Sequence, residues 1–222
     1  MSTQTAITPS ALETLERLRA AQAFAVVRAR DGDEAVAIAE ALHAGGLEGI
    51  ELTFTTPGLV EALAEVRKRV GGRLLLGAGT ITTAAQVEAA VAAGADFVVT
   101  PHLDPPLLDA MLASGKLALP GVLTPSEVAA ALRAGALAVK LFPASTVGIG
   151  HMKALFGPFP ALEVVPTGGI AVATARGWLD AGAAAVGLGG ELLPQKLRDA
   201  QAWDEISSNA ALLLAELRGK AA

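Results

Sequence analysis

Short apolar runs alternate with alanine-rich segments along most of this 222-residue chain. The runs occupy residues 24–28, 49–53, 74–77, 97–100, 117–120, 138–141, 164–166 and 184–187. They are short and bounded by glycine or proline, which is typical of buried strands. Between them, segments such as 33–43 and 83–93 carry Ala, Val, Leu and Ile at helical spacing. The pattern therefore predicts eight strands, each followed by a helix.

Residues that commonly begin and end helices support this division. Four helices should end just before a glycine, which readily adopts the left-handed conformation needed there. These glycines lie in Ala-Gly-Gly or Ala-Gly-Ala tripeptides at residues 44–46, 93–95, 134–136 and 181–183. Asp33, Thr82 and Thr124 stand where N-caps are expected. One more amphipathic helix is predicted at 11–20, and a final helix at 199–217.

Eight consecutive strand–helix units with nearly continuous apolar strands predict a parallel sheet covered by helices. Eight units favour an α/β fold closed into a (β/α)8 TIM barrel, and an open doubly wound sheet is the alternative. No linker or change of composition divides the chain. We therefore expect one domain over residues 1–222. An N-terminal helical extension (1–22) would lie over the bottom or side of the barrel (23–222).

Composition narrows the functional classes. Hydrophobic residues make up 52% of the chain and charged residues 18%, which favours a large core and excludes disorder. The net charge of −5, without a basic block, argues against a nucleic-acid or anionic-membrane partner. Without cysteine, a membrane-spanning apolar stretch or an export signal, the chain is expected to be cytoplasmic. His43, His102 and His151 lack ligand spacing, so no metal site is expected.

Lys140 is the exception within its apolar run. It lies between Val139 and Leu141, in the strand predicted at 138–141, where its neighbours should be buried. Burying a lysine ammonium without a partner is costly. A buried lysine that is uncharged is a nucleophile, able to form a Schiff base with a carbonyl substrate. The alternative is a lysine whose ammonium reaches solvent at the end of the strand.

Glu51 is a second charged residue in an apolar run, at the centre of the strand predicted at 49–53. The second and sixth strands of an eight-stranded ring stand opposite each other, and alternate strands share interior layers. We therefore expect Glu51 and Lys140 to meet near the axis. An amine beside a carboxylate base is typical of Schiff-base catalysis, and a buried structural ion pair is the alternative.

Glycine pairs follow the last two predicted strands, at residues 168–169 and 189–190. Their backbone N–H groups should be exposed beside the starts of helices. The loops after the seventh and eighth strands of such barrels commonly hold a phosphate group. The alternative is a pair of tight turns without a ligand.

Six motifs occur in order between about residues 28 and 190. They are Glu-Leu-Thr-Phe-Thr at 51–55, Gly-Ala-Gly-Thr at 77–80, Thr-Pro-His-Leu-Asp at 100–104, Pro-Gly-Val-Leu-Thr-Pro-Ser-Glu at 120–127, Lys-Leu-Phe-Pro-Ala at 140–144 and Pro-Thr-Gly-Gly-Ile at 166–170. Together they resemble one family, the class I 2-keto-3-deoxy-6-phosphogluconate (KDPG) / 4-hydroxy-2-oxoglutarate (KHG) aldolases. The resemblance implies a homotrimer of TIM barrels that acts on a small 2-keto acid and requires no metal or organic cofactor.

By this resemblance, Lys140 is the Schiff-base lysine and Glu51 is the general acid/base. The residues around the pyruvate moiety of the substrate are then Thr80, Pro101, Phe142 and Thr167. The substrate phosphate would contact Gly168, Gly169, Gly189 and Gly190. His102 and Asp104 also match a family motif, and we expect each to make a structural hydrogen bond.

Two positions depart from the family pattern. Many members carry an arginine four residues after the glutamate, where it holds the substrate carboxylate, and this chain has Thr55. Arg28, at the end of the first strand, resembles an arginine that other members use and can supply that charge. We therefore count Arg28 and Thr55 with the substrate-binding residues. Gly190 stands where the family often has a phosphate-binding serine, and Glu191 would weaken phosphate binding unless it points away.

The expected reaction is cleavage of 2-keto-3-deoxy-6-phosphogluconate to pyruvate and glyceraldehyde 3-phosphate. Cleavage of 4-hydroxy-2-oxoglutarate to pyruvate and glyoxylate is a second expected activity. Three alternatives stay open. They are a 2-keto-3-deoxy-6-phosphogalactonate aldolase of the same family, a phosphosugar isomerase on a TIM barrel, and a non-catalytic trimeric or shell-forming scaffold.

Overall fold

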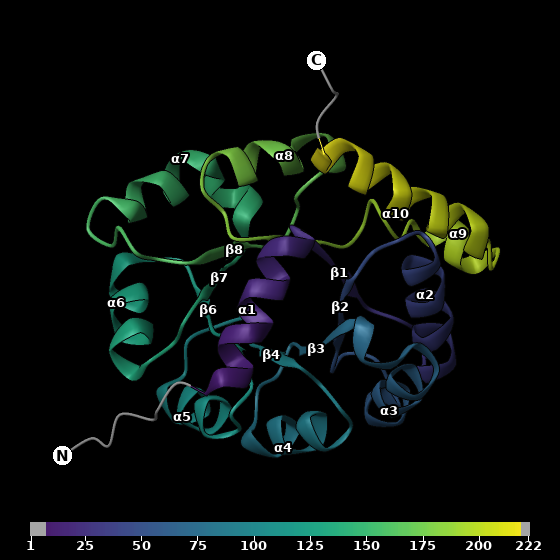
Figure 1. Ribbon diagram of the computed structural model, residues 1–222, viewed down its shortest axis with the longest axis horizontal. Coiled ribbons are helices and arrows are strands. Elements are labelled where there is room, and N and C mark those ends of the chain that lie inside the picture. Colours follow the sequence, from purple (N-terminus) through teal and green to yellow (C-terminus); the bar gives the residue numbers. More distant parts are fainter. Residues whose placement is uncertain (1–7, 219–222) are drawn as a thin grey trace.

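Strands and helices alternate along the chain, as the sequence pattern predicts. The computed structural model describes residues 8–218. The strands in this part are β1 (Ala23–Val27), β2 (Gly49–Thr53), β3 (Leu75–Gly79), β4 (Phe97–Val99), β5 (Leu117–Leu119), β6 (Gly121–Val122), β7 (Val139–Leu141), β8 (Val164–Pro166) and β9 (Val186–Leu188). The helices are α1 (Pro9–Ala21), α2 (Gly32–Ala44), α3 (Leu59–Val70), the 3-10 turn η1 (Gly71–Arg73), α4 (Ala84–Ala92), α5 (Pro105–Ala113), α6 (Pro125–Ala134), α7 (Ala144–Phe156), α8 (Val172–Asp180), α9 (Gln195–Asp199) and α10 (Trp203–Arg218). Figure 1 shows the helices arranged around the strands.

The strands form two parallel sheets. A curled six-stranded sheet has the order β5-β4-β3-β2-β1-β9, and a three-stranded sheet has the order β6-β7-β8. The run predicted as a strand at 117–120 corresponds to β5, which ends at Leu119, and β6, which starts at Gly121, is a short strand that the sequence pattern did not predict. Pro120 lies between the two and has no N–H with which to continue the hydrogen-bond ladder.

The two sheets also meet at their other border. The backbone N–H of Ala184 donates to the carbonyl of Val164 at 2.8 Å. Three residues further along β8 and its loop, Thr167 forms an isolated parallel bridge with Gly187 of β9. The predicted parallel α/β architecture is therefore confirmed.

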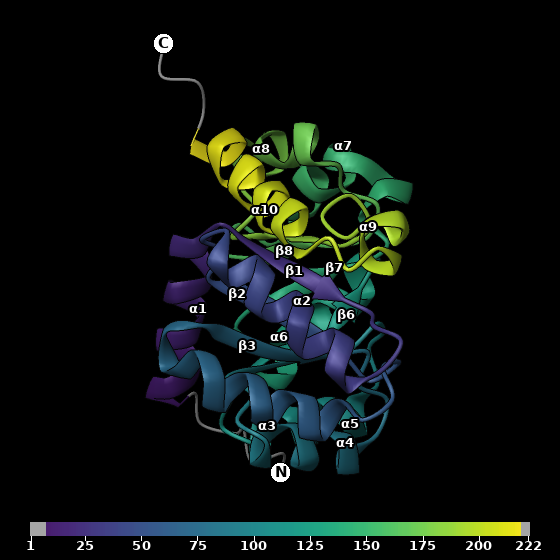
Figure 2. The same cartoon turned by 90° about the vertical axis from the view of Figure 1, so that its right-hand side faces the viewer.

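Helix α1 covers one end of the strands. Figure 2 shows α1 on one side of the strands and α9 on the opposite side. Leu15 and Leu18 of α1 are buried in one cluster with Phe24 and Phe97, whose rings pack edge to face with centroids 5.7 Å apart. Burial of each such apolar side chain contributes about 1.5–3 kcal/mol. The helix predicted at 11–20 is confirmed, and it closes the end of the core away from the loops that follow the strands.

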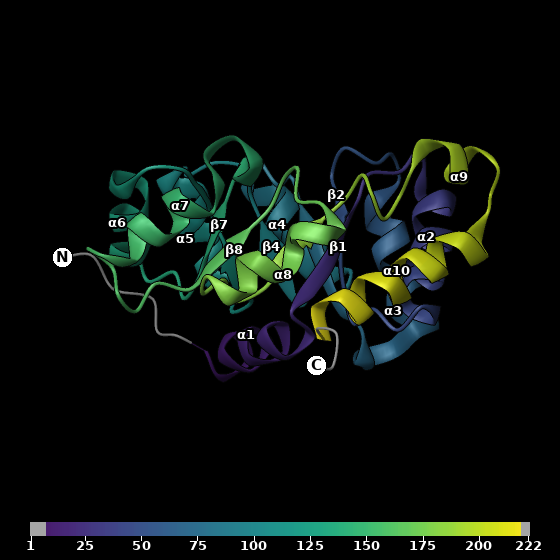
Figure 3. The ribbon, with the colours of Figure 1, turned by 90° about the horizontal axis from the view of Figure 1, so that it is seen from above.

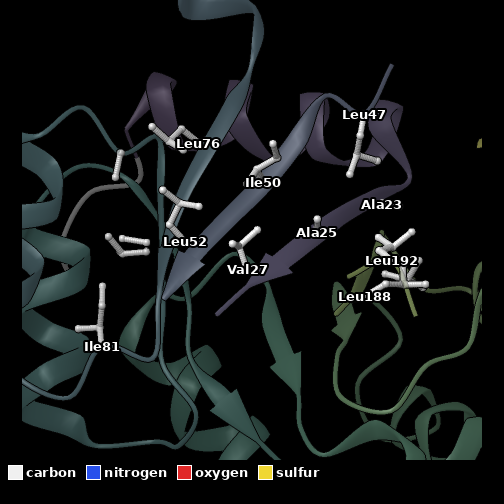
Figure 4. Packing of buried hydrophobic residues seen from close by; sticks show 14 of the residues in the cluster. Ala23, Ala25, Val27, Leu47, Ile50, Leu52, Leu76, Ile81, Leu188 and Leu192 are labelled. Atoms are coloured by element: carbon white, nitrogen blue, oxygen red, sulfur yellow. The ribbon is translucent and has the colours of Figure 1, made fainter. Parts of the chain in front are cut away.

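A second cluster lies between the strands and the outer helices. Figure 4 shows Ile50 and Leu52 of β2 beside Val27 of β1 and Leu76 of β3, within this layer. Successive side chains of a strand point to opposite faces. Glu51, between Ile50 and Leu52, therefore points away from the outer helices and into the interior.

Two of the three predicted N-caps are wrong by one or two residues. The cap of α2 is Asp31, whose carboxylate accepts from the N–H of Glu34, and Asp33 lies in the first turn. The cap of α4 is Thr83, not Thr82. Thr124 caps α6 as predicted, within a capping box. The glycines at 46, 94, 135 and 182 all have positive φ, which confirms the predicted helix ends.

The final helix begins later than predicted. The segment at 199–217 contains the end of α9 and most of α10, separated by a short turn. Gln201 in this turn has a φ of 50°, a left-handed conformation that interrupts a right-handed helix. Helix α10 packs against α2 and α8 (Figure 3). No helix in residues 8–218 has the length and apolar character needed to cross a membrane.

Candidate active site

Lys140 and Glu51 meet in the interior. Lys140 lies on β7, between Gly121 of β6 and Val165 of β8 in the register of the sheet. Its Nζ is 3.8 Å from Oε1 of Glu51, and the two side chains are 3% and 0% exposed. No residue among 8–218 hydrogen-bonds either carboxylate oxygen of Glu51. A buried carboxylate with this little support is costly, and it is available to exchange protons with a reacting group.

Gly79 makes the room that Glu51 occupies. The two residues lie on adjacent strands, and a Cβ at position 79 would stand 1.7 Å from Oε1 and 2.3 Å from Cδ of Glu51. Gly77, two residues earlier, faces the ring of Phe97 in the same way, at 2.3 Å. Both glycines of the Gly-Ala-Gly-Thr motif are therefore required by a neighbouring side chain. The sequence alone gave the motif no such explanation.

Arg28 follows β1 and lies over the ends of β2 and β3. Its Nη1 donates to the hydroxyls of Thr55 and Thr80, both at 3.2 Å. The Thr55 hydroxyl also pairs with that of Thr53 at 2.8 Å. Thr80 has a φ of 54°, an uncommon conformation for a residue with a branched side chain. The structure thus places the guanidinium directly beside Thr55, the position at which the family resemblance implies an arginine.

A cavity of about 370 Å³ opens beside Lys140. Most of the predicted site residues line it, namely Arg28, Lys140, Phe142, Thr167, Gly168, Gly169, Gly189 and Gly190. Four predicted residues, Glu51, Thr55, Thr80 and Pro101, are not among its lining residues. Glu51 lies behind Lys140, and Thr55 and Thr80 contact Arg28. Pro101 packs its backbone against Gly121, the register partner of Lys140.

The loop after β8 forms the wall next to Lys140. The Nζ of Lys140 is 5.2 Å from the centroid of the Phe142 ring. Gly168 and Gly169 have φ of 95° and 71°, a conformation that side chains rarely adopt. The buried hydroxyl of Thr167 has no hydrogen-bond partner within the described chain.

Glu191 turns toward the N-terminus of α8, which follows the loop that carries Gly168 and Gly169. Its Oε2 accepts a hydrogen bond of 2.6 Å from the backbone N–H of Val172, the first residue of α8. A carboxylate is favourable at this position because it meets the positive end of the helix dipole. The N-terminus of α8 is therefore occupied by Glu191 and is not free to bind a phosphate.

Arg198 is a cavity residue that the sequence reasoning missed. It lies on α9, and its side chain is 14% exposed. Its Nη1 donates to the carbonyl of Arg28 at 3.0 Å and lies 3.7 Å from the carboxylate of Glu34. In the sequence, Arg198 is only a cationic residue between the last glycine pair, at 189–190, and the final helix predicted at 199–217.

The charge of the cavity suits an anionic ligand. Arg28, Lys140 and Arg198 line it, and no carboxylate is among its lining residues. Asp104 caps α5, as expected for a structural role. The expectation for His102 is wrong for its side chain, which is exposed, and only its backbone carbonyl accepts a hydrogen bond, from the Thr100 hydroxyl at 2.6 Å. Within residues 8–218, no group of three or more His, Cys, Asp or Glu side chains is placed to hold a metal.

Comparisons with known proteins agree with this geometry. Residues 14–209 match the family described as "Aldolase: KDPG and KHG aldolase". A 2-dehydro-3-deoxy-phosphogluconate aldolase of Treponema pallidum is 41% identical over 159 residues, which is 71% of this chain and 74% of that protein. A 2-dehydro-3-deoxy-6-phosphogalactonate aldolase of Escherichia coli is 32% identical over 76% of this chain and 83% of its own length.

Among solved structures, a KDPG aldolase from Legionella pneumophila superposes with a TM-score of 0.83 at 33% identity. The match covers 90% of this chain and 97% of the other. That crystal structure holds pyruvate captured at low pH as a covalent carbinolamine intermediate.

Proposed function

Because this chain belongs to the KDPG and KHG aldolase family, we propose that it is a class I aldolase that cleaves 2-keto-3-deoxy-6-phosphogluconate to pyruvate and glyceraldehyde 3-phosphate. The observation that carries the proposal is the buried pair of Lys140 and Glu51, with Nζ and Oε1 3.8 Å apart, beside a cationic cavity. Such a pair supplies both a nucleophile for a ketone and a base within reach of it.

The reaction begins at the C2 ketone of the substrate. The uncharged amine of Lys140 attacks C2 and forms a carbinolamine, whose loss of water gives a protonated imine. Glu51 donates the proton that leaves with this water. Arg28 binds the substrate carboxylate through its guanidinium, which the hydroxyls of Thr55 and Thr80 hold in place.

The imine then accepts the electrons of the breaking bond. Glu51, now a carboxylate, takes the proton of the C4 hydroxyl through an intervening water as the C3–C4 bond breaks, because its own oxygens are buried and do not line the cavity. The aldehyde departs, and its former bonding electrons form an enamine between C3 and the lysine-bound C2. Protonation at C3 and hydrolysis of the resulting imine release pyruvate and restore the amine of Lys140.

The finer features of the fold are also part of the proposal. The Ala184–Val164 hydrogen bond and the Thr167–Gly187 bridge support closure of the two sheets into one (β/α)8 barrel. We propose a single domain over residues 1–222, in which an N-terminal helical extension (1–22) precedes the barrel (23–222). The homotrimer and the cytoplasmic location stay predictions.

Borohydride trapping tests the chemistry. Incubation with pyruvate and borohydride should label the protein covalently at Lys140, because reduction fixes the imine. The Lys140→Ala variant should lose both labelling and pyruvate release while remaining folded. Lys153→Ala, which removes a lysine outside the cavity, is the matched control and should keep both. Labelling that persists in Lys140→Ala on any of the other five lysines would refute the assignment.

The same assays separate the alternatives. A phosphosugar isomerase forms no imine with pyruvate, so borohydride does not label it. A non-catalytic scaffold releases no pyruvate from any of these substrates. The 6-phosphogalactonate activity has direct support from the E. coli relative. Pyruvate release from the gluconate and galactonate epimers, and from 4-hydroxy-2-oxoglutarate, therefore defines the substrate range.

A further inference from the structure

Arg198 has an unused hydrogen-bonding capacity at the cavity. Its Nη1 donates to the Arg28 carbonyl, and its Nη2 donates to Oε1 of Gln195. Its Nε is buried and has no partner within residues 8–218. An arginine has five N–H donors, so apart from the buried Nε these bonds leave one N–H on each of Nη1 and Nη2 for a ligand at the cavity wall.

The charge of Arg198 is only partly balanced by the protein. The nearest carboxylate is that of Glu34, 3.7 Å from Nη1. Glu34 is itself shared with Arg30, which lies 3.2 Å from Oε1 and donates its backbone N–H to Oε2 at 2.6 Å. Arg30 also lies 4.0 Å from Asp199, so two carboxylates face the two guanidinium groups, but neither carboxylate lines the cavity that Arg198 faces.

Two other positions near the glycine loops could bind an anion, but one is occupied and the other has no side-chain donor. The N–H of Val172 at the start of α8 is bonded to Glu191. Gly190 offers no side-chain donor, and a Cβ there would meet nothing within 4 Å. The cavity wall formed by the glycine loops therefore has backbone donors but lacks a charged side chain other than Arg198.

We propose that Arg198 binds the distal phosphate of the substrate and sets the preference for phosphorylated 2-keto-3-deoxy acids. The assignment rests on the proposed aldolase function. Arg198 lines the cavity with the glycine loops and bonds only the backbone carbonyl of Arg28, whereas the guanidinium of Arg28 is held by the hydroxyls of Thr55 and Thr80. The two guanidinium groups thus divide the two substrate anions, the phosphate going to Arg198 and the carboxylate to Arg28. A guanidinium suits this role because it binds phosphate oxygens in a bidentate manner.

The test compares one sugar acid with and without its phosphate. Arg198→Met removes the charge and keeps an extended apolar stem. We expect its kcat/KM for 2-keto-3-deoxy-6-phosphogluconate to fall roughly 10- to 100-fold, the range for losing a charged hydrogen bond. Its kcat/KM for 2-keto-3-deoxygluconate should change less than about threefold. The matched control is Arg30→Met, which removes the other arginine beside Glu34 and does not line the cavity.

Each failure has a separate meaning. Equal losses for both substrates would overturn the proposal, because Arg198 would then act only by holding the backbone of Arg28. Equal losses in Arg30→Met and Arg198→Met would also overturn it. If Arg198→Met does not fold, Arg198→Lys is measured in its place, because it keeps the positive charge and should fold. Its preference for the phosphorylated substrate should fall, by a smaller factor than expected for Arg198→Met, and an unchanged preference would overturn the proposal. Wild-type protein that neither cleaves these acids nor is labelled with pyruvate would instead refute the aldolase function itself.

Discussion

Replacing Gly79 with alanine should inactivate the enzyme by moving its base. The new Cβ would lie 1.7 Å from Oε1, 2.3 Å from Cδ and 2.6 Å from Cγ of Glu51. Ordinary contacts of a Cβ lie near 3.4–4 Å, so the carboxylate must move by well over an ångström. Residue 79 cannot move instead, because it is paired with Thr53 in the parallel ladder between β2 and β3.

The loss of activity follows from the displacement. A misplacement of about 1 Å can cost roughly 100-fold in rate, and losing a general base costs about 10²- to 10⁴-fold. We expect the kcat of Gly79→Ala for pyruvate release to fall within that range. Overpacking a core costs about 1–3 kcal/mol, so the variant should be less stable than the wild type but folded.

Gly77→Ala is the matched control. Gly77 lies on the same strand as Gly79, and the three atoms nearest to its Cβ would all belong to the Phe97 ring, the closest at 2.3 Å. The variant should lose a similar amount of stability in denaturant titration and keep most of its kcat. A double-mutant cycle with Glu51→Gln adds a second check, because both changes disable the same carboxylate. Gly79→Ala should then cost little further activity in the Glu51→Gln background.

A near-normal kcat in Gly79→Ala would refute the reasoning, since the carboxylate would then have an alternative position from which it acts equally well. Full additivity of the two substitutions would refute it as well. The glycine would then affect catalysis by a route that does not involve Glu51.

Two further substitutions test the carboxylate site and the helix caps. Arg28→Lys should raise KM for all pyruvate-bearing substrates by roughly 10-fold or more, because an ammonium cannot reproduce a guanidinium fork. Loss of phosphate preference instead would assign Arg28 to the phosphate. Burial raises the pKa of Glu127, but hydrogen bonds from Leu123 and Thr124 outweigh it and lower that pKa below 4.5. Glu127→Ala should therefore cost about 0.5–2 kcal/mol at pH 7, and in denaturant titrations the cost should shrink as the pH falls through that lowered pKa. A cost unchanged at low pH would contradict this.

The limits of sequence reasoning are visible at particular residues. The runs at 49–53 and 164–166 match β2 and β8. They could be predicted because the spacing of apolar residues, and the glycine or proline residues that bound a strand, are local properties of the sequence. Asp31 and Asp33 both suit an N-cap by type, and only the backbone conformation of the folded chain selects Asp31. The run at 117–120 was correctly identified as strand, but the break at Pro120 depends on which neighbours β5 and β6 find.

The sequence by itself determined the alternation of strands and helices, the positions of Lys140 and Glu51 within apolar runs, and the resemblance to an aldolase family. These depend on the residue types present and on spacings of a few positions. Only the tertiary structure decided that Gly79 must lack a side chain, that Glu191 turns toward α8 and that Arg198 reaches the cavity. Arg198 donates to the backbone of a residue 170 positions away, and Gly79 meets Glu51 across two strands. Such contacts are set by how the sheet curls and the loops pack, which no local pattern specifies.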